Sequence, residues 1–134
     1  MNLPPPAVNA DSREFWEAAR AHRLLINRCD ACAKVFFPPS YLCPRCWSDK
    51  TSWLDSAGKG TVYSYTIMAR APAPEFAARV PYVVALIDLT EGPRVMANIV
   101  GPHALETAVG EQVAVCFEDR SDGWKVPQFQ RAVA

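Results

Sequence analysis

Hydrophobic and polar residues alternate in short runs along most of the chain, and proline and glycine separate these runs. One early segment differs, because residues 12–25 place Phe15 and Ala19 on one face, which predicts an amphipathic helix. Asp11 followed by Glu14 predicts a capping box with Asp11 as the N-cap. The apolar side chains of this helix either pack on their own domain or dock on a partner protein.

Three short β-strands are predicted next, at residues 24–28, 34–37 and 51–54. Each of the first two flanks a pair of cysteines, and Pro38-Pro39 ends the second strand. The third strand follows a second pair of cysteines. The arrangement is typical of a small β module built around a metal site rather than around a large apolar core.

The remainder of the chain has the β-branched and aromatic content of strands. Gly58 and Gly60 mark its beginning. Five strands are predicted, at residues 61–70, 82–90, 94–100, 112–118 and 125–130. A short helical turn at residues 103–109 precedes the fourth strand. Five strands with a helical insert at this place predict a compact five-stranded barrel of the OB type.

Four cysteines form the most specific motif of the sequence. Two C-x2-C pairs, Cys29 with Cys32 and Cys43 with Cys46, are separated by ten residues. Each pair fits a knuckle whose sulfurs face one ion, and four thiolates can close a tetrahedral shell around Zn²⁺ at roughly 2.3 Å. A closed shell leaves no open position for a substrate, so the predicted zinc ion is structural. Iron in a rubredoxin-type site is the alternative, because ligand type and geometry suit both metals.

Other uses of the cysteines are disfavoured. Disulfides suit a secreted chain, but no export signal is visible at the start, and the expected compartment is the cytoplasm, where thiols stay reduced. A redox pair would need a thioredoxin-like βαβ setting, which the pattern lacks. The fold class is therefore mainly β, with an N-terminal arm and helix (1–25), a four-cysteine zinc ribbon (26–56) and an OB-fold barrel (57–134).

Composition and charge narrow the function classes. Half of the 134 residues are hydrophobic and 21% are charged, which is globular composition. Fourteen basic and fourteen acidic residues give a formal net charge of zero, whereas a nucleic-acid binder usually has a basic excess. No apolar run approaches the ~20 residues of a membrane helix. A single-stranded nucleic-acid binding module is therefore the alternative rather than the leading hypothesis, although zinc ribbons and OB-folds both serve there.

No constellation of catalytic residues is visible. The two histidines, His22 and His103, are each solitary, and there is neither a nucleophile elbow nor a phosphate-binding loop. Asp88 interrupts an apolar strand, and we expect it to face outward. Cys116 has no paired histidine or cysteine in the pattern, so a small packing role is expected. The chain is expected to be non-catalytic by itself.

Aromatic and basic residues of the barrel offer the other candidate contacts. Tyr63 and Tyr65 are expected to share one strand face, and Tyr82 follows the proline-rich loop. Such a face can stack an adenine of CoA or of nucleic acid, although packing within the barrel is the more ordinary role. Guanidinium groups match phosphate in a bidentate way, so arginines are candidates for CoA phosphates. These arginines are Arg70, Arg79 and Arg94.

The order of these parts resembles the DUF35-type proteins, in which an N-terminal helix and a rubredoxin-like zinc ribbon precede an OB-fold. The resemblance covers nearly the whole chain. It rests on the four cysteines with Phe36-Phe37-Pro38-Pro39 between them and on several barrel segments. These segments are residues 60–66, 81–87, 91–95, 109–113 and 126–129. One departure is visible, because knuckles of this kind often carry glycine just after the second cysteine, where this chain has Ala33 and Trp47.

The resemblance implies a function that the residues alone do not. Members of this family generally act as non-catalytic partners of acyl-CoA enzymes, chiefly thiolase-type carbon–carbon bond enzymes, and some are paired with hydratase-like and retro-aldolase systems. The expected role is therefore that of an accessory subunit in a hetero-oligomeric protein complex, which supports assembly and acyl-CoA binding. The ribbon would then present a partner surface with Phe36, Phe37 and Trp47. These aromatic residues suit interface anchors, or else they form the core of the ribbon.

Overall fold

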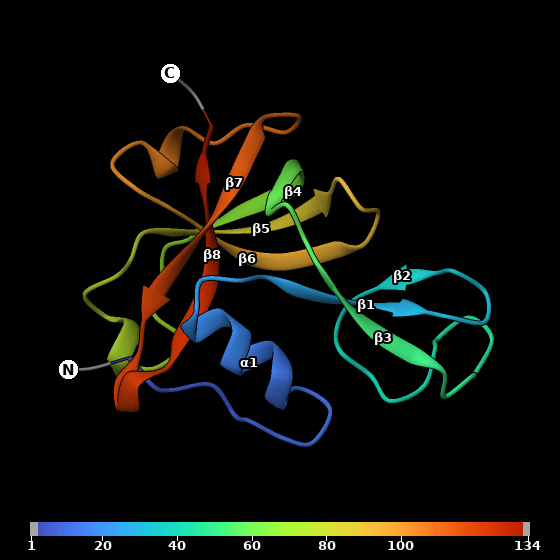
Figure 1. Cartoon of the computed structure of the whole chain (residues 1–134). Helices are drawn as coiled ribbons and strands as arrows, with labels where there is room; N and C mark the ends of the chain where they lie inside the picture. The colour runs from blue at the N-terminus through green and yellow to red at the C-terminus, as the bar shows by residue number, and fades with distance from the viewer. Residues whose placement is uncertain (1–2, 133–134) are drawn as a thin grey trace.

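The computed structural model describes residues 3–132 and contains one α-helix and eight β-strands (Figure 1). The helix, α1 (Arg13–Arg20), is shorter than predicted, and the predicted capping box is wrong. Ser12 is the N-cap, and its hydroxyl bonds the side chain of Asn9 rather than the helix. The helix ends early because His22 adopts a left-handed backbone with φ of 60°, which lets the N–H of Arg23 close on the carbonyl of Ala18.

The three predicted strands around the cysteines are present. They are β1 (Leu25–Cys29), β2 (Val35–Phe36) and β3 (Thr51–Asp55). They form an antiparallel sheet in the order β2-β1-β3, which projects to one side of the molecule in Figure 1.

The remaining strands close a barrel, as predicted. They are β4 (Lys59–Met68), β5 (Tyr82–Leu89), β6 (Arg94–Val100), β7 (Gln112–Asp119) and β8 (Lys125–Arg131). The order around the barrel is β4-β5-β6-β8-β7, and only the β6–β8 pairing is parallel. A short helix, η2 (Ala104–Glu106), precedes β7. This is the topology of the expected OB-fold.

A β-bulge in β4 changes which side chains share a face. Val62 lies opposite Ile87 and Ser64 lies opposite Leu86, so Tyr63 is an extra residue between the two pairs. The alternation shifts by one residue beyond such a bulge. Tyr65 consequently lies opposite the inward-facing Ala85, whereas Tyr63 contacts Arg94 on the outer face of the barrel. The expectation that Tyr63 and Tyr65 share one face is wrong.

One apolar core joins the three parts of the chain. Phe15 of α1 and Leu24 and Ile26 at the start of the ribbon belong to the same buried cluster as the barrel residues. The barrel contributes Val62, Val83, Ala85, Ile87, Leu89, Val95, Ile99, Val113 and Phe129. In Figure 1 the helix α1 lies beside β8, and the contacts between these two elements agree with that view. The ribbon and helix are therefore packed on the barrel, while the boundaries predicted after residues 25 and 56 stay predictions.

Candidate metal centre and surrounding surfaces

Two turns of the same geometry position the four cysteines. Cys29 ends β1 and Cys43 opens the second turn, and each carbonyl accepts an N–H four residues later, from Ala33 at 2.8 Å and from Trp47 at 2.9 Å. Ala33 and Trp47 have φ of 67° and 66°, so both occupy the left-handed region where such knuckles often have glycine. The departure noted in the sequence therefore leaves the turn geometry intact, at the expense of backbone strain in two residues.

The four sulfurs form one compact group. All four Sγ atoms lie within 4.8 Å of one another, an arrangement that could hold a metal ion. Cys29 Sγ lies 3.5 Å from Cys46 Sγ, and Cys32 Sγ lies 3.7 Å from Cys43 Sγ. Tetrahedral zinc with bonds of roughly 2.3 Å places its sulfurs about 3.8 Å apart, so the donor set and its spacing fit Zn²⁺. Cys116 is not part of this group.

The protonation of these thiols also favours a cation. The backbone N–H of Cys32 approaches the sulfur of Cys29 at 3.4 Å and is the largest cause of its lowered pKa. Burial alone would raise the pKa of Cys43, but backbone N–H groups, first that of Cys46, lower it to about 6. The backbone N–H of Ser48 lowers the pKa of Cys46, but the neighbouring sulfurs, chiefly that of Cys29, raise it overall to about 12. Sulfurs this close cannot all ionise without a cation between them.

The aromatic residues of the ribbon divide between its interior and its surface. Phe36 is only 4% exposed and packs with Cys29 and Cys43, so it belongs to the core of the ribbon and not to the expected partner surface. Phe37 is half-buried, with its ring 5.4 Å from that of Phe15. Trp47 is 75% exposed. Of the three aromatic residues predicted for the partner surface, Trp47 is therefore the one that the fold leaves accessible.

Arg94 is held by two neighbours on the outer face of the barrel. Its Nε donates to Asp88 at 2.7 Å, and its guanidinium lies 3.4 Å from the centre of the Tyr63 ring. The hydrogen bond that Arg94 donates to Asp88 is the first cause of the raised pKa of Arg94. Asp88 faces outward, as predicted. Tyr63 thus stacks on an arginine of its own chain, which competes with any base or adenine at this position.

The other two arginines lie elsewhere. Arg79 pairs with Glu118 at 2.7 Å and lines, with Tyr82, a cavity of about 400 Å³ beside the loop that follows β6. Arg70 is exposed in the segment after β4. Arg94 contributes to a different hollow, next to the ribbon. The structure therefore does not bring the three predicted arginines to one site, and their contact with CoA or a partner stays a prediction.

The second half of β4 forms a surface that the sequence analysis did not identify. The pairing of β4 with β7 ends at Thr61, and within residues 3–132 the stretch after the bulge, residues 64–68, pairs with β5 alone. Tyr65 is 38% exposed and Ile67 is 44% exposed, although both lie opposite buried core residues of β5. An uncharged strand with an open edge and exposed apolar side chains is suited to contact with another protein.

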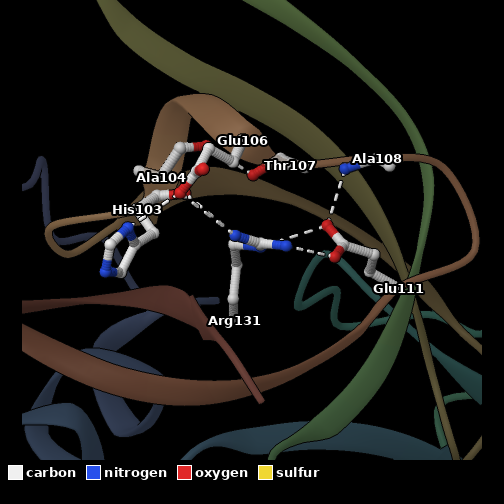
Figure 2. A network of polar contacts seen from close by, with 7 residues as sticks. All are labelled: His103, Ala104, Glu106, Thr107, Ala108, Glu111 and Arg131. Atoms are coloured by element: carbon white, nitrogen blue, oxygen red, sulfur yellow. Dashed lines mark hydrogen bonds and ion pairs between the residues drawn. The ribbon is translucent and has the colours of Figure 1, made fainter. Parts of the chain in front are cut away.

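A network of polar contacts fixes the loop between β6 and β7 (Figure 2). Arg131 of β8 donates from Nε to Glu111 at 3.1 Å and from Nη1 to the carbonyl of His103 at 3.3 Å. Glu111 also accepts the N–H of Ala108 at 2.7 Å. The hydrogen bonds from Arg131 are the first cause of the lowered pKa of Glu111. Figure 2 shows His103 at the margin of this network, where it contacts Glu106 at 2.7 Å.

The second histidine, His22, stacks on Phe117 with 5.2 Å between the ring centres. It therefore links the end of α1 to β7.

No helix within residues 3–132 has both the length and the apolar character required to cross a membrane.

Comparisons with known proteins agree with this architecture. A family model described as "ChsH2, rubredoxin-like zinc ribbon domain" matches residues 16–52, and one described as "ChsH2, C-terminal OB-fold domain" matches residues 53–118. These matches confirm the predicted zinc ribbon, with one structural metal ion, followed by an OB-fold.

Three similar proteins have informative descriptions. A probable enoyl-CoA hydratase alpha subunit of Thermomonospora curvata is 39% identical over 130 residues, which are 97% of this chain but only 40% of that protein. A DUF35 domain-containing scaffold protein of Methanocaldococcus jannaschii is 36% identical, over 81% of this chain and 80% of the relative. A solved structure described as an Ltp2-ChsH2(DUF35) aldolase superposes with a TM-score of 0.84 at 39% identity, over 96% of this chain and 99% of the matched chain.

Proposed function

The chain belongs to the DUF35 family, with the zinc ribbon and OB-fold of the ChsH2 type, and we propose that it is a non-catalytic accessory subunit of an acyl-CoA enzyme complex. Its partner would be a thiolase-like enzyme that forms or cleaves a carbon–carbon bond. The observation that carries the proposal is the likeness, over nearly the full length of both chains, to the DUF35 chain of the Ltp2-ChsH2 aldolase. The name scaffold protein given to a relative agrees with it.

The metal centre supports this role indirectly. In our proposal Cys29, Cys32, Cys43 and Cys46 are the four zinc ligands. When bound, zinc supplies cross-linking of the two knuckles and no chemistry on a substrate, because four thiolates close its coordination shell. The cross-linked ribbon holds Phe37 against Phe15 and thereby keeps α1 on the barrel. The partner would then contact a preformed surface rather than a folding one.

Two exposed surfaces are suited to the partner enzyme. One is Trp47 on the second knuckle, which lies beside a hollow formed with Tyr41 and Pro44. The other is the open edge of β4 with Tyr65 and Ile67. Aromatic and large apolar side chains in such positions are the usual anchors of protein interfaces.

The proposal includes support of acyl-CoA binding by the assembled complex. Arg70 is exposed and forms no ion pair among the described residues, whereas Arg79 and Arg94 are already paired with Glu118 and Asp88. A charge reversal, Arg70→Glu, should therefore weaken the affinity of the purified complex for acyl-CoA. An unchanged affinity would remove Arg70 from the site and leave the scaffold role intact.

A pull-down from the native cell extract, with mass spectrometry of the bound proteins, tests the proposal. The wild-type chain should retain a thiolase-like or related acyl-CoA enzyme in a fixed ratio. Cys29→Ser should lose both zinc and the enzyme, whereas Cys116→Ser, which changes a cysteine outside the sulfur group, should retain both. A soluble, zinc-free Cys29→Ser protein that still binds the enzyme would contradict the role of the ribbon. Recovery of nucleic acid and its enzymes in place of an acyl-CoA enzyme would favour the alternative class.

A further inference from the structure

A cavity of about 480 Å³ lies between the parts of the chain. Its walls come from the N-terminal arm and α1, from Phe37-Pro38-Pro39 of the ribbon, and from β6 and β8 of the barrel. Its volume is within the roughly 300–1,000 Å³ that small-molecule sites occupy, and such sites are frequent where domains meet. Most of the lining is apolar, with Phe15, Leu24 and Phe129 among its buried members.

One charged side chain stands out in this lining. Arg120 follows β7, and only 9% of its side chain is exposed. Its Nε is the one buried side-chain nitrogen or oxygen within residues 3–132 that has no hydrogen-bond partner. Gln128, the other buried polar residue of the cavity, is satisfied by the backbone N–H and the side chain of Asn98. A buried donor without a hydrogen-bond partner lowers the stability of the fold, and the loss is larger for a charged group such as a guanidinium. The unpaired Nε therefore indicates that an acceptor is missing near Arg120.

The charges around Arg120 do not balance within the cluster. Arg120 and Arg79 share a single carboxylate, that of Glu118, at 2.9 Å and 2.7 Å. The cluster therefore carries one excess positive charge. Asp11 is the only carboxylate in the cavity lining, but it is solvent-exposed on the N-terminal arm and forms no ion pair with Arg120 among the described residues.

We propose that this cavity is a binding site for a small amphiphilic monocarboxylate, whose apolar body fills the cavity and whose carboxylate pairs with the guanidinium of Arg120. A carboxylate is favoured because it is planar and matches the donor geometry of a guanidinium. Burial lowers the pKa of Arg120. A guanidinium nevertheless stays protonated in proteins, so the group is available as a cation. The site belongs to this chain alone and does not depend on the proposed partner enzyme.

The test is calorimetric titration of the zinc-loaded full chain with decanoate and with decanol. The two probes have the same apolar length, but only decanoate carries a charge. Decanoate should bind about tenfold more tightly or better, since a charge-assisted hydrogen bond is worth at least that factor. Arg120→Met should abolish this preference and leave the affinity for decanol unchanged. Arg45→Met, at an exposed arginine of the second knuckle, should behave as the wild type.

A second variant locates the site and covers the case in which Arg120→Met does not fold. Ala97 lies on the cavity wall in β6, so Ala97→Phe should occupy the space and weaken both probes. Equal affinity of the wild type for decanoate and decanol would overturn the proposal. No binding of either probe up to about 1 mM would also overturn it, and so would a preference for decanoate that survives in the folded Arg120→Met protein.

Discussion

Replacement of Ala33 by glycine should strengthen zinc binding. Ala33 closes the first knuckle with φ of 67°, a left-handed conformation that costs an L-residue about 1–2 kcal/mol. Glycine has no such penalty, but it loses about 0.5–1 kcal/mol of additional conformational entropy on folding. The net gain expected for Ala33→Gly is therefore from near zero to about 1.5 kcal/mol. The N–H that bonds the carbonyl of Cys29 is kept.

A matched control is present in the same knuckle. Ala31 is also exposed, but its φ is not positive, so Ala31→Gly should show only the entropic loss. Both substitutions change the unfolded chain in the same way. The difference between them therefore isolates the conformational strain of Ala33, and it should amount to about 1–2 kcal/mol.

Zinc affinity measures this difference directly, because folding of a ribbon this small is coupled to metal binding. Competition with a chromophoric chelator should show that Ala33→Gly binds zinc about fivefold to thirtyfold more tightly than Ala31→Gly. The pH must be held constant, since binding displaces thiol protons. Equal affinities of the two variants would show that the left-handed turn is not strained, and the knuckle geometry described above would then be wrong.

Three further predictions test other parts of the fold. Gly60→Ala should lower the free energy of unfolding by about 1–3 kcal/mol in denaturant titrations, because a Cβ there would lie 2.6 Å from the side chain of Ile87 and 2.8 Å from the carbonyl oxygen of Asp88. Glu111→Gln should destabilise the chain at neutral pH, because Arg131 lowers the pKa of Glu111 and so favours the folded, ionised form. The destabilisation should fade as acid protonates Glu111 in the wild type. Thermal melts of the variant and the wild type should therefore differ at neutral pH and converge in acid. Removal of zinc by a strong chelator should abolish hydrogen-exchange protection in β1–β3 but leave it in β5, β6 and β8, because these strands retain the barrel core.

Much of the fold could be predicted because its signals are local. Period-two alternation and turn residues marked every strand of the ribbon and barrel, and the C-x2-C spacing marked the metal group. Two features that were predicted wrongly, the end of α1 and the shared face of Tyr63 and Tyr65, have no such local signal. His22 ends α1 in a left-handed conformation, and only a glycine or asparagine at this position would have indicated the helix end in the sequence. The bulge at Tyr63 likewise occurs without a glycine, and it alone reversed the face of Tyr65.

The surroundings of each candidate residue could not be predicted, because they depend on contacts between distant segments. Arg94 and Asp88 are six residues apart in the sequence, but Tyr63, which stacks on Arg94, comes from the more distant strand β4. Arg120 was not singled out at all in the sequence. Its unpaired Nε becomes visible only when the arm, the ribbon and the barrel are placed around one cavity. Burial and unsatisfied donors are properties of packing, whereas sequence patterns report mainly local conformation.

The metal centre and the cavity are linked through two adjacent residues. Phe36 packs on the sulfur group, while its neighbour Phe37 lines the cavity and contacts Phe15. Phe36 is the last residue of β2 and Phe37 follows it directly, so the end of β2 connects the two sites. Loss of zinc should therefore free Phe37 as well as Phe36, and the cavity should lose one wall even though the barrel persists. On this argument the structural metal controls the shape of the cavity and the placement of α1, and zinc-free protein should bind decanoate no better than decanol.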